Sequence, residues 1–124
     1  MTADRSMRFA RVHHVSINVT DIDESRRFYG EVLGLASLPR PDFGFPGEWL
    51  DAGEQQIHLI EAKDFEAPDG RHFALEVDDL DATIAVLNER GVDVSEPADI
   101  DGVCRQAFFS DPTGNLIELN QPTG

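Results

Sequence analysis

The chain has 124 residues, of which 40% are hydrophobic, and a formal net charge of −14. This length fits one domain, or two small halves that share a core, and the composition is that of a globular protein. The acidic balance argues against nucleic acid and anionic membrane surfaces, because both are bound through basic patches.

The sequence pattern indicates neither a membrane span nor a signal peptide. The apolar runs fall far short of the roughly 20 residues that a membrane span needs, and residues 1–8 lack the apolar core of a signal peptide. The lone Cys104 fits a reducing compartment and excludes an intrachain disulfide. We therefore predict a cytoplasmic protein whose residues 1–10 form a frayed leader.

The first half opens with a strand and a helix. From residue 12 to 19 apolar and polar residues alternate, and His14 lies on the polar face of this strand. Asp21 is placed as the N-cap of a helix over 22–33, and Gly34 as its C-terminal stop.

Shorter elements complete this half. A strand is predicted over 35–38, ended by Pro39, and a Pro/Gly-rich loop follows over 40–47. Residues 48–52 and 55–61 read as two strands joined by a tight turn.

The second half repeats the order of the first. A strand over 72–77 begins with His72, and a helix over 80–90 ends at Gly91. The remaining predictions are a short strand over 92–94, a loop over 97–102, and strands over 103–110 and 116–121.

Each half therefore reads β-α-β-β-β. We predict an α+β fold in a single domain, 1–124, built from two βαβββ modules over 9–61 and 71–121 with a linker over 62–70. One amphipathic helix per module would cover the apolar side of the strands and leave the other side as an open trough.

Four residues at repeated positions carry the chemistry. His14 and His72 each open the first strand of a half. His58 follows His14 by 44 positions and Glu118 follows His72 by 46, each in the last strand of its half. All four face away from the apolar stripe of their strand, toward the trough. Three imidazoles and one carboxylate suit one divalent Fe, Co, Ni, Zn or Mn ion better than Ca or Mg.

Three segments carry a resemblance to a known family: residues 14–19, 28–35 and 111–119. With them the chain resembles the vicinal oxygen chelate superfamily, which groups glyoxalase I, methylmalonyl-CoA epimerase, extradiol dioxygenases, and fosfomycin- and bleomycin-resistance proteins. The resemblance implies paired βαβββ modules in a cupped sheet that holds one divalent metal. It also implies that the metal ligands are His14, His58, His72 and Glu118.

The second ligand position leaves the reaction open. Glyoxalase I relatives usually carry Glu there and the epimerases Gln, whereas this chain has His58. A fourth protein ligand leaves two of the six coordination positions of the metal open, which suits a bidentate enolate better than a catechol together with dioxygen. The resemblance thus favours glyoxalase- or epimerase-like lyase or isomerase chemistry on a small vicinally oxygenated substrate, through a metal-stabilised enolate.

Two alternatives stay open. If His58 swings away from the metal, it becomes a candidate base. The remaining ligands, His14, His72 and Glu118, then match the two His and one Glu of ring-cleaving dioxygenases. A ligand-sequestering resistance protein without catalysis is the other, although bleomycin-binding relatives lack the ligand set.

Further residues complete the predicted site. Glu118 is the first candidate for moving protons, and His58 the second. Arg105 is a candidate for holding a substrate carboxylate or phosphate. Phe43, Phe45 and Trp49 are candidates for the apolar wall of a small-molecule pocket. A homodimer is expected, because two modules leave open sheet edges that relatives of this kind close by pairing.

Overall fold

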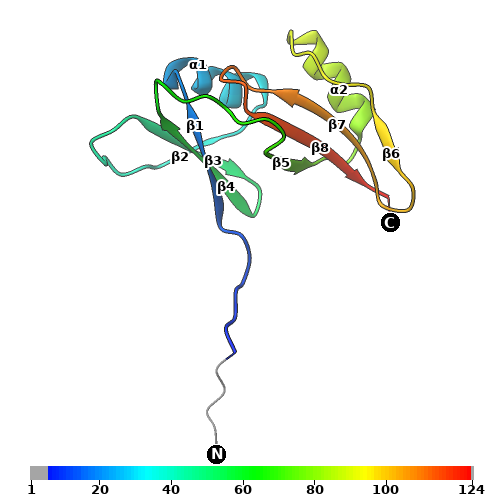
Figure 1. Cartoon of the computed structure of the whole chain (residues 1–124), viewed down its shortest axis with the longest axis horizontal. Coiled ribbons are helices and arrows are strands. Elements are labelled where there is room, and N and C mark those ends of the chain that lie inside the picture. The colour runs from blue at the N-terminus through cyan, green and yellow to red at the C-terminus, as the bar shows by residue number, and fades with distance from the viewer. Residues whose placement is uncertain (1–5, 124) are drawn as a thin grey trace, which may run out of the picture.

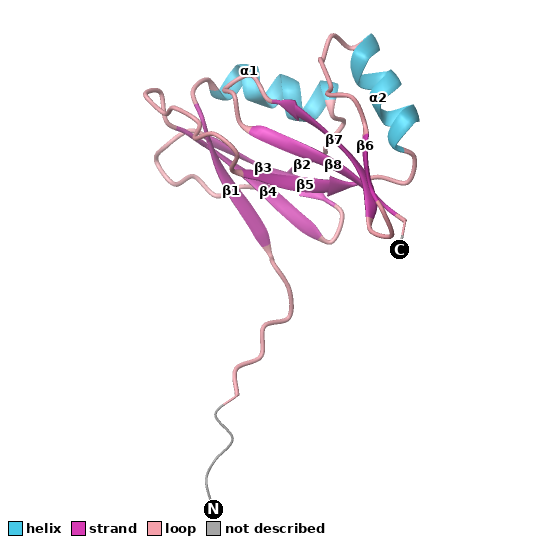
Figure 2. Cartoon of the chain, turned by 45° about the vertical axis from the view of Figure 1, so that its right-hand side comes forward, coloured by secondary structure: helices cyan, strands magenta, loops and turns pink. Residues whose placement is uncertain are grey.

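A computed structural model describes residues 6–123 of the chain and shows two four-stranded mixed sheets with the helices on one side of them (Figures 1 and 2). The first sheet has the order β1-β4-β3-β2 and the second β5-β8-β7-β6. In each sheet the first strand of the half is parallel to the last, and the other pairs are antiparallel. The two halves thus share one topology, and the predicted α+β fold is confirmed.

The elements follow one another in the predicted order, with one π-helical segment (η1) after the first helix. Their bounds in the first half are β1 (His14–Val19), α1 (Ile22–Arg27), η1 (Phe28–Val32), β2 (Ser37–Leu38), β3 (Gly47–Ala52) and β4 (Gln55–Glu61). Those of the second half are β5 (His72–Glu76), α2 (Leu80–Glu89), β6 (Ala98–Ile100), β7 (Cys104–Ser110) and β8 (Leu116–Pro122).

The alternating pattern of the strands decides which face is buried. Ile57 and Leu59 of β4 belong to one apolar core, which they share with Ile117 and Leu119 of β8. Both helices contribute to the same core. Because successive strand side chains point to opposite faces, the residues between these apolar positions lie on the face away from the helices.

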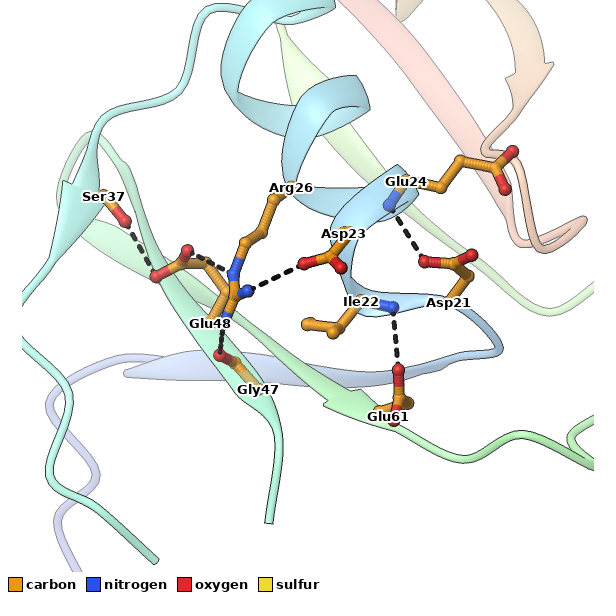
Figure 3. Close-up of polar contacts among 9 residues, drawn as sticks. All are labelled: Asp21, Ile22, Asp23, Glu24, Arg26, Ser37, Gly47, Glu48 and Glu61. Carbon is orange, nitrogen blue, oxygen red and sulfur yellow. Dashed lines mark hydrogen bonds and ion pairs between the residues drawn. The ribbon is translucent and has the colours of Figure 1, made fainter.

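Capping carboxylates start both helices: Asp21, as the sequence predicts, and Asp79 at the matching position of the second half. Asp21 accepts a hydrogen bond from the backbone N–H of Glu24, and Asp79 accepts one from Ala82. Figure 3 shows how polar contacts then fix α1 on its sheet: the Glu61 carboxylate accepts from the Ile22 N–H. Arg26 donates to Glu48, whose carboxylate also accepts from the Ser37 hydroxyl in β2 (Figure 3).

The first predicted helix changes its winding before it ends. Residues 22–27 are α-helical, but 28–32 form a π-helical turn closed by the bond from the Leu33 N–H to the Phe28 carbonyl at 2.9 Å. Gly34 follows with φ of 78°, the left-handed conformation expected of a C-terminal stop.

Two predictions in the second half are wrong. Residues 92–94 form no strand, because Val92 closes the end of α2: its N–H donates to the Leu87 carbonyl while the Gly91 N–H donates to that of Asn88. A strand instead lies within the predicted loop 97–102, where β6 pairs with β7.

Contacts at one end of the sheets join the two halves. The Tyr29 hydroxyl donates to Asp111 at 2.8 Å, and Asn115 Nδ2 donates to the Asn18 carbonyl at 2.9 Å. The Thr20 N–H donates to the Thr113 hydroxyl at 3.0 Å. The turn between β7 and β8 therefore holds β1 and η1 of the other half.

The chain before β1 extends away from the sheets (Figure 1). Of the predicted leader 1–10, residues 6–10 form no helix or strand, and residues 1–5 lie outside the described part. Among the described residues, no helix has the length and apolar character that crossing a membrane requires.

Candidate metal centre

The polar face of the first sheet carries a stack of three rings. The imidazoles of His14 in β1 and His58 in β4 lie with their centroids 3.9 Å apart and their planes 15° from parallel. The Trp49 ring of β3 covers the other side of His58, with centroids 4.4 Å apart and planes within 10°. The ring of His58 is thus held between two others and is 8% exposed, whereas His14 is exposed.

A side-chain contact fixes the tautomer of His58. Its Nε2 lies 2.8 Å from Gln56 Oε1, and since an amide oxygen only accepts, Nε2 carries the proton and Nδ1 keeps its lone pair. Burial, followed by electrostatic repulsion from the neighbouring His14, His13 and Arg40 side chains, lowers the pKa of His58 below its ordinary value of 6.5. The ring is therefore neutral at pH 7 and able to act as a ligand or a base.

The second sheet holds a matching pair. His72 Nε2 in β5 lies 3.1 Å from Glu118 Oε1 in β8. The Gly70 carbonyl accepts from His72 Nδ1 at 2.9 Å, and the contact between His72 Nε2 and Glu118 is itself a hydrogen bond, whose proton a metal ion would replace. Asn120 Nδ2 donates to the other oxygen of Glu118 at 2.8 Å.

This second pair fits a divalent metal. Two donor atoms about 2.0–2.2 Å from one ion stand roughly 3 Å apart when they are neighbouring ligands, and the observed separation is 3.1 Å. The hydrogen bonds from His72 to Gly70 and from Asn120 to Glu118 orient the imidazole and the carboxylate, as the surroundings of metal ligands commonly do.

The first pair fits one ion only after a rearrangement. A metal bound to an imidazole nitrogen lies in the plane of that ring, and the nearly parallel planes of His14 and His58 do not meet near either ring. One ring has to leave the stack before both can bind the same ion.

The two pairs are not brought together within the chain. Among residues 6–123 no three His, Cys, Asp or Glu side chains are grouped closely enough to hold a metal. Each half therefore supplies two of the four predicted ligands on its own sheet.

The predicted aromatic wall gathers beside the first pair. Phe43 and Phe45 are stacked with centroids 5.8 Å apart, and Phe43 lies 6.0 Å from Trp49. Arg105 lies in β7 of the other sheet, where it donates to Asp81 and Asp99. The structure thus groups the three aromatic candidates with His58 and places Arg105 elsewhere.

Two orienting residues were missed in the sequence. Gln56 and Asn120 each lie two positions from a predicted ligand on the same strand face, the former before His58 and the latter after Glu118. The period of 2 along a strand is a signal that could have found them.

The comparisons with known proteins agree with this fold. Residues 11–119 match the family model described as Glyoxalase/Bleomycin resistance protein/Dioxygenase superfamily. A probable lactoylglutathione lyase of Vibrio cholerae serotype O1 is 32% identical over 90% of this chain and 90% of its own length.

Two solved structures are similar over nearly the whole chain. A glyoxalase family protein from Bacillus anthracis has a TM-score of 0.86 and 26% identity, covering 95% of this chain and 99% of the other. TnmS3, an antibiotic binding protein from Streptomyces sp. CB03234, has a TM-score of 0.78 and 35% identity, covering 95% and 100%. Since the family model spans most of the sequence, this chain belongs to the Glyoxalase/Bleomycin resistance protein/Dioxygenase superfamily.

Proposed function

We propose that this protein is a metal-dependent lyase or isomerase of the glyoxalase type, acting on a small substrate with two neighbouring oxygens. The observation that carries the proposal is the pair His72–Glu118, whose donor atoms stand 3.1 Å apart with each side chain oriented by its own hydrogen bond. The likeness to lactoylglutathione lyase supports this reaction class.

The proposed ligands are His14, His58, His72 and Glu118. A bound divalent ion would act as a Lewis acid toward the two substrate oxygens and stabilise the negative charge that develops on them. Glu118 would take a proton from a substrate carbon and return it, while Asn120 holds its second oxygen. His58, neutral and with a free Nδ1, would be the second group able to accept a proton.

We further propose that a second copy of the chain completes the site. Each half offers only two ligands on its own sheet, and two are too few to hold a catalytic divalent ion tightly. A homodimer in which the first half of one chain faces the second half of the other would bring the pairs together.

The first test measures metal binding. Protein loaded in turn with Ni, Zn, Mn, Co and Fe(II) is expected to retain one ion per site, quantified by elemental analysis and titration calorimetry. His72→Ala and Glu118→Gln should each weaken binding more than about 100-fold, and Asn120→Ala about tenfold. His58→Ala should cost less than His14→Ala, because recruiting His58 breaks two ring stacks worth about 0.5–1.5 kcal/mol each.

Matched controls separate these effects from general damage. Glu31→Gln on η1 and Glu89→Gln on α2 each neutralise an exposed carboxylate outside the proposed ligand set. Both should keep wild-type affinity. If the folded protein takes up none of these metals, the metal-dependent reaction is ruled out. If it takes up one of them, the metal-loaded protein is assayed for lactoylglutathione lyase activity.

A second candidate function is the sequestration of a ligand without catalysis. The likeness to an antibiotic binding protein and the aromatic cluster beside His58 favour it. Ligand binding that is unchanged by His72→Ala and Glu118→Gln, together with absent metal uptake, would select this function. Oxygen uptake with catechols and Fe(II) would instead indicate ring-cleaving dioxygenation.

A further inference from the structure

A small cavity opens beside His58 on the polar side of the first sheet. It measures about 150 Å³, and its walls include the aromatic rings of Phe43, Phe45 and Trp49, the imidazole of His58 and the side chain of Arg40. A cavity of about this size holds one benzene ring. Its aromatic walls favour a planar ring, which can lie offset-stacked or edge-on against them.

Arg40 gives the cavity a positive charge. Its guanidinium carbon lies 4.9 Å from the Phe43 ring centroid and 5.1 Å from that of Phe45, and one nitrogen donates to the Phe45 carbonyl at 3.2 Å. A Cβ at position 47 would come within 2.6 Å of the Leu59 carbonyl and 2.7 Å of this guanidinium, so Gly47 lets both lie close to β3. The cation is thus held in place by ring faces and backbone.

The remaining donors of Arg40 have no carboxylate partner among residues 6–123. Among the described residues, Arg26 pairs with Glu48 and Asp23 and Arg105 with Asp81 and Asp99, whereas Arg40 forms no such ion pair. In a chain with 24 acidic residues, an arginine in a cavity wall without one is free to meet a carboxylate from outside.

The charge of the whole chain limits what that anion can be. A net charge of −14 repels polyanions such as nucleotides, whereas a single carboxylate matches one guanidinium. Phe43 and Phe45 are 50% and 47% exposed, an apolar rim that an incoming ring would cover.

We propose that this cavity binds an aromatic carboxylate group, with its planar ring against the walls formed by Trp49, Phe43 and Phe45 and its carboxylate on Arg40. The inference deepens the proposed function and rests on it, because it assigns the chemical class of the substrate part that lies beside His58, while the two neighbouring oxygens that would meet the metal belong to the rest of the substrate. Binding itself needs no metal.

Trp49 is the only tryptophan of the chain, so its fluorescence reports on this cavity alone. The full-length, metal-free protein is titrated with benzoate, with benzamide as the uncharged ring and with cyclohexanecarboxylate as the non-planar acid. Benzoate should change the Trp49 emission. It should bind about tenfold more tightly than benzamide, which lacks the charge-assisted contact, and than cyclohexanecarboxylate, which lacks the ring stack.

Variants separate the two contacts. Arg40→Gln should weaken benzoate about tenfold and leave benzamide unchanged, a difference that loss of folding would not produce. Arg40→Lys keeps the charge without the planar guanidinium, so its affinity for benzoate should lie between those of the wild type and Arg40→Gln. Phe43→Leu should weaken both aromatic ligands, while Arg27→Gln on exposed α1 and Phe9→Leu, which is 84% exposed, should change neither.

The outcomes also distinguish this inference from the metal-dependent reaction. Equal affinities for benzoate and benzamide, or no response to benzoate up to about 10 mM, which is weaker than ordinary ligand binding, would overturn the inference even if metal is bound. Benzoate bound through Arg40 by a protein that takes up no metal would support the cavity and refute the metal-dependent function.

Discussion

Tyr29 shows at the scale of one residue how the two halves depend on each other. It is the only tyrosine of the chain, it is fully buried, and its hydroxyl donates to Asp111 of the other half. The same carboxylate accepts from the Thr113 and Asn115 N–H groups. Burial above all, then the charge of Asp111 and the hydrogen bond to it, raises the pKa of Tyr29 far above its ordinary value of 10.

This shift predicts how stability responds to alkali. Above pH 10 the unfolded chain loses the tyrosine proton while the folded chain keeps it, so the unfolded state binds fewer protons and stability falls. The free energy of unfolding should drop by up to about 1.4 kcal/mol for each pH unit above 10. Denaturant titrations from pH 8 to 11 measure this slope, and absorbance at 295 nm follows the tyrosinate.

Tyr29→Phe supplies the control. Its free energy of unfolding should be lower by about 1–3 kcal/mol at pH 7, because Asp111 loses a buried donor. The variant should also lack the part of the alkaline slope that comes from the tyrosine. Tyrosinate absorbance that appears near pH 10 in the folded protein would contradict the buried hydrogen bond.

At the scale of elements, local sequence signals fixed the helix ends better than the weak strands. Asp21, Gly34 and Gly91 act as predicted, and Asp79 caps α2 as Asp21 caps α1, because capping depends on neighbouring backbone groups. The strand expected over 92–94 failed because Val92 is used in the end of α2 instead. The three residues of β6 are all exposed and gave no apolar alternation, and pairing with β7 makes their strand, helped by the Asp99–Arg105 ion pair.

Removing one cap tests this account of α2. Asp79→Ala should lower the free energy of unfolding by about 1 kcal/mol, since the Ala82 N–H loses its acceptor at the first turn. Asp78→Ala removes an equal, exposed charge next to it without touching a cap and should cost less than about 0.5 kcal/mol. Equal losses in chemical denaturation would show that charge rather than capping is responsible.

At the scale of the whole molecule, one chain presents its candidate ligands as two separate pairs. The sheets share a core and are joined through the β7–β8 turn, yet His14 and His58 lie on one sheet and His72 and Glu118 on the other. If a second copy completes the proposed site, each site draws one pair from each chain.

Mixing variants tests that arrangement. His14→Ala chains and His72→Ala chains should each bind no metal alone, but refolded together they should regain about a quarter of the wild-type content. Half of the dimers are then mixed, and each mixed dimer carries one intact site of two. Absence of recovery, with mixed dimers verified by mass spectrometry, would place all ligands of a site in one chain.

The sequence by itself determined the α+β class, the duplicated order of elements and the face on which each candidate ligand lies. These follow from a period of 2 in strands and from caps that act within a few residues. Only the tertiary structure decided that His58 is stacked between His14 and Trp49, that Gln56 and Asn120 orient ligands, and that Arg40 lies over Phe43 and Phe45. Such contacts depend on the pairing of distant strands and on ring orientation, which periodicity does not encode.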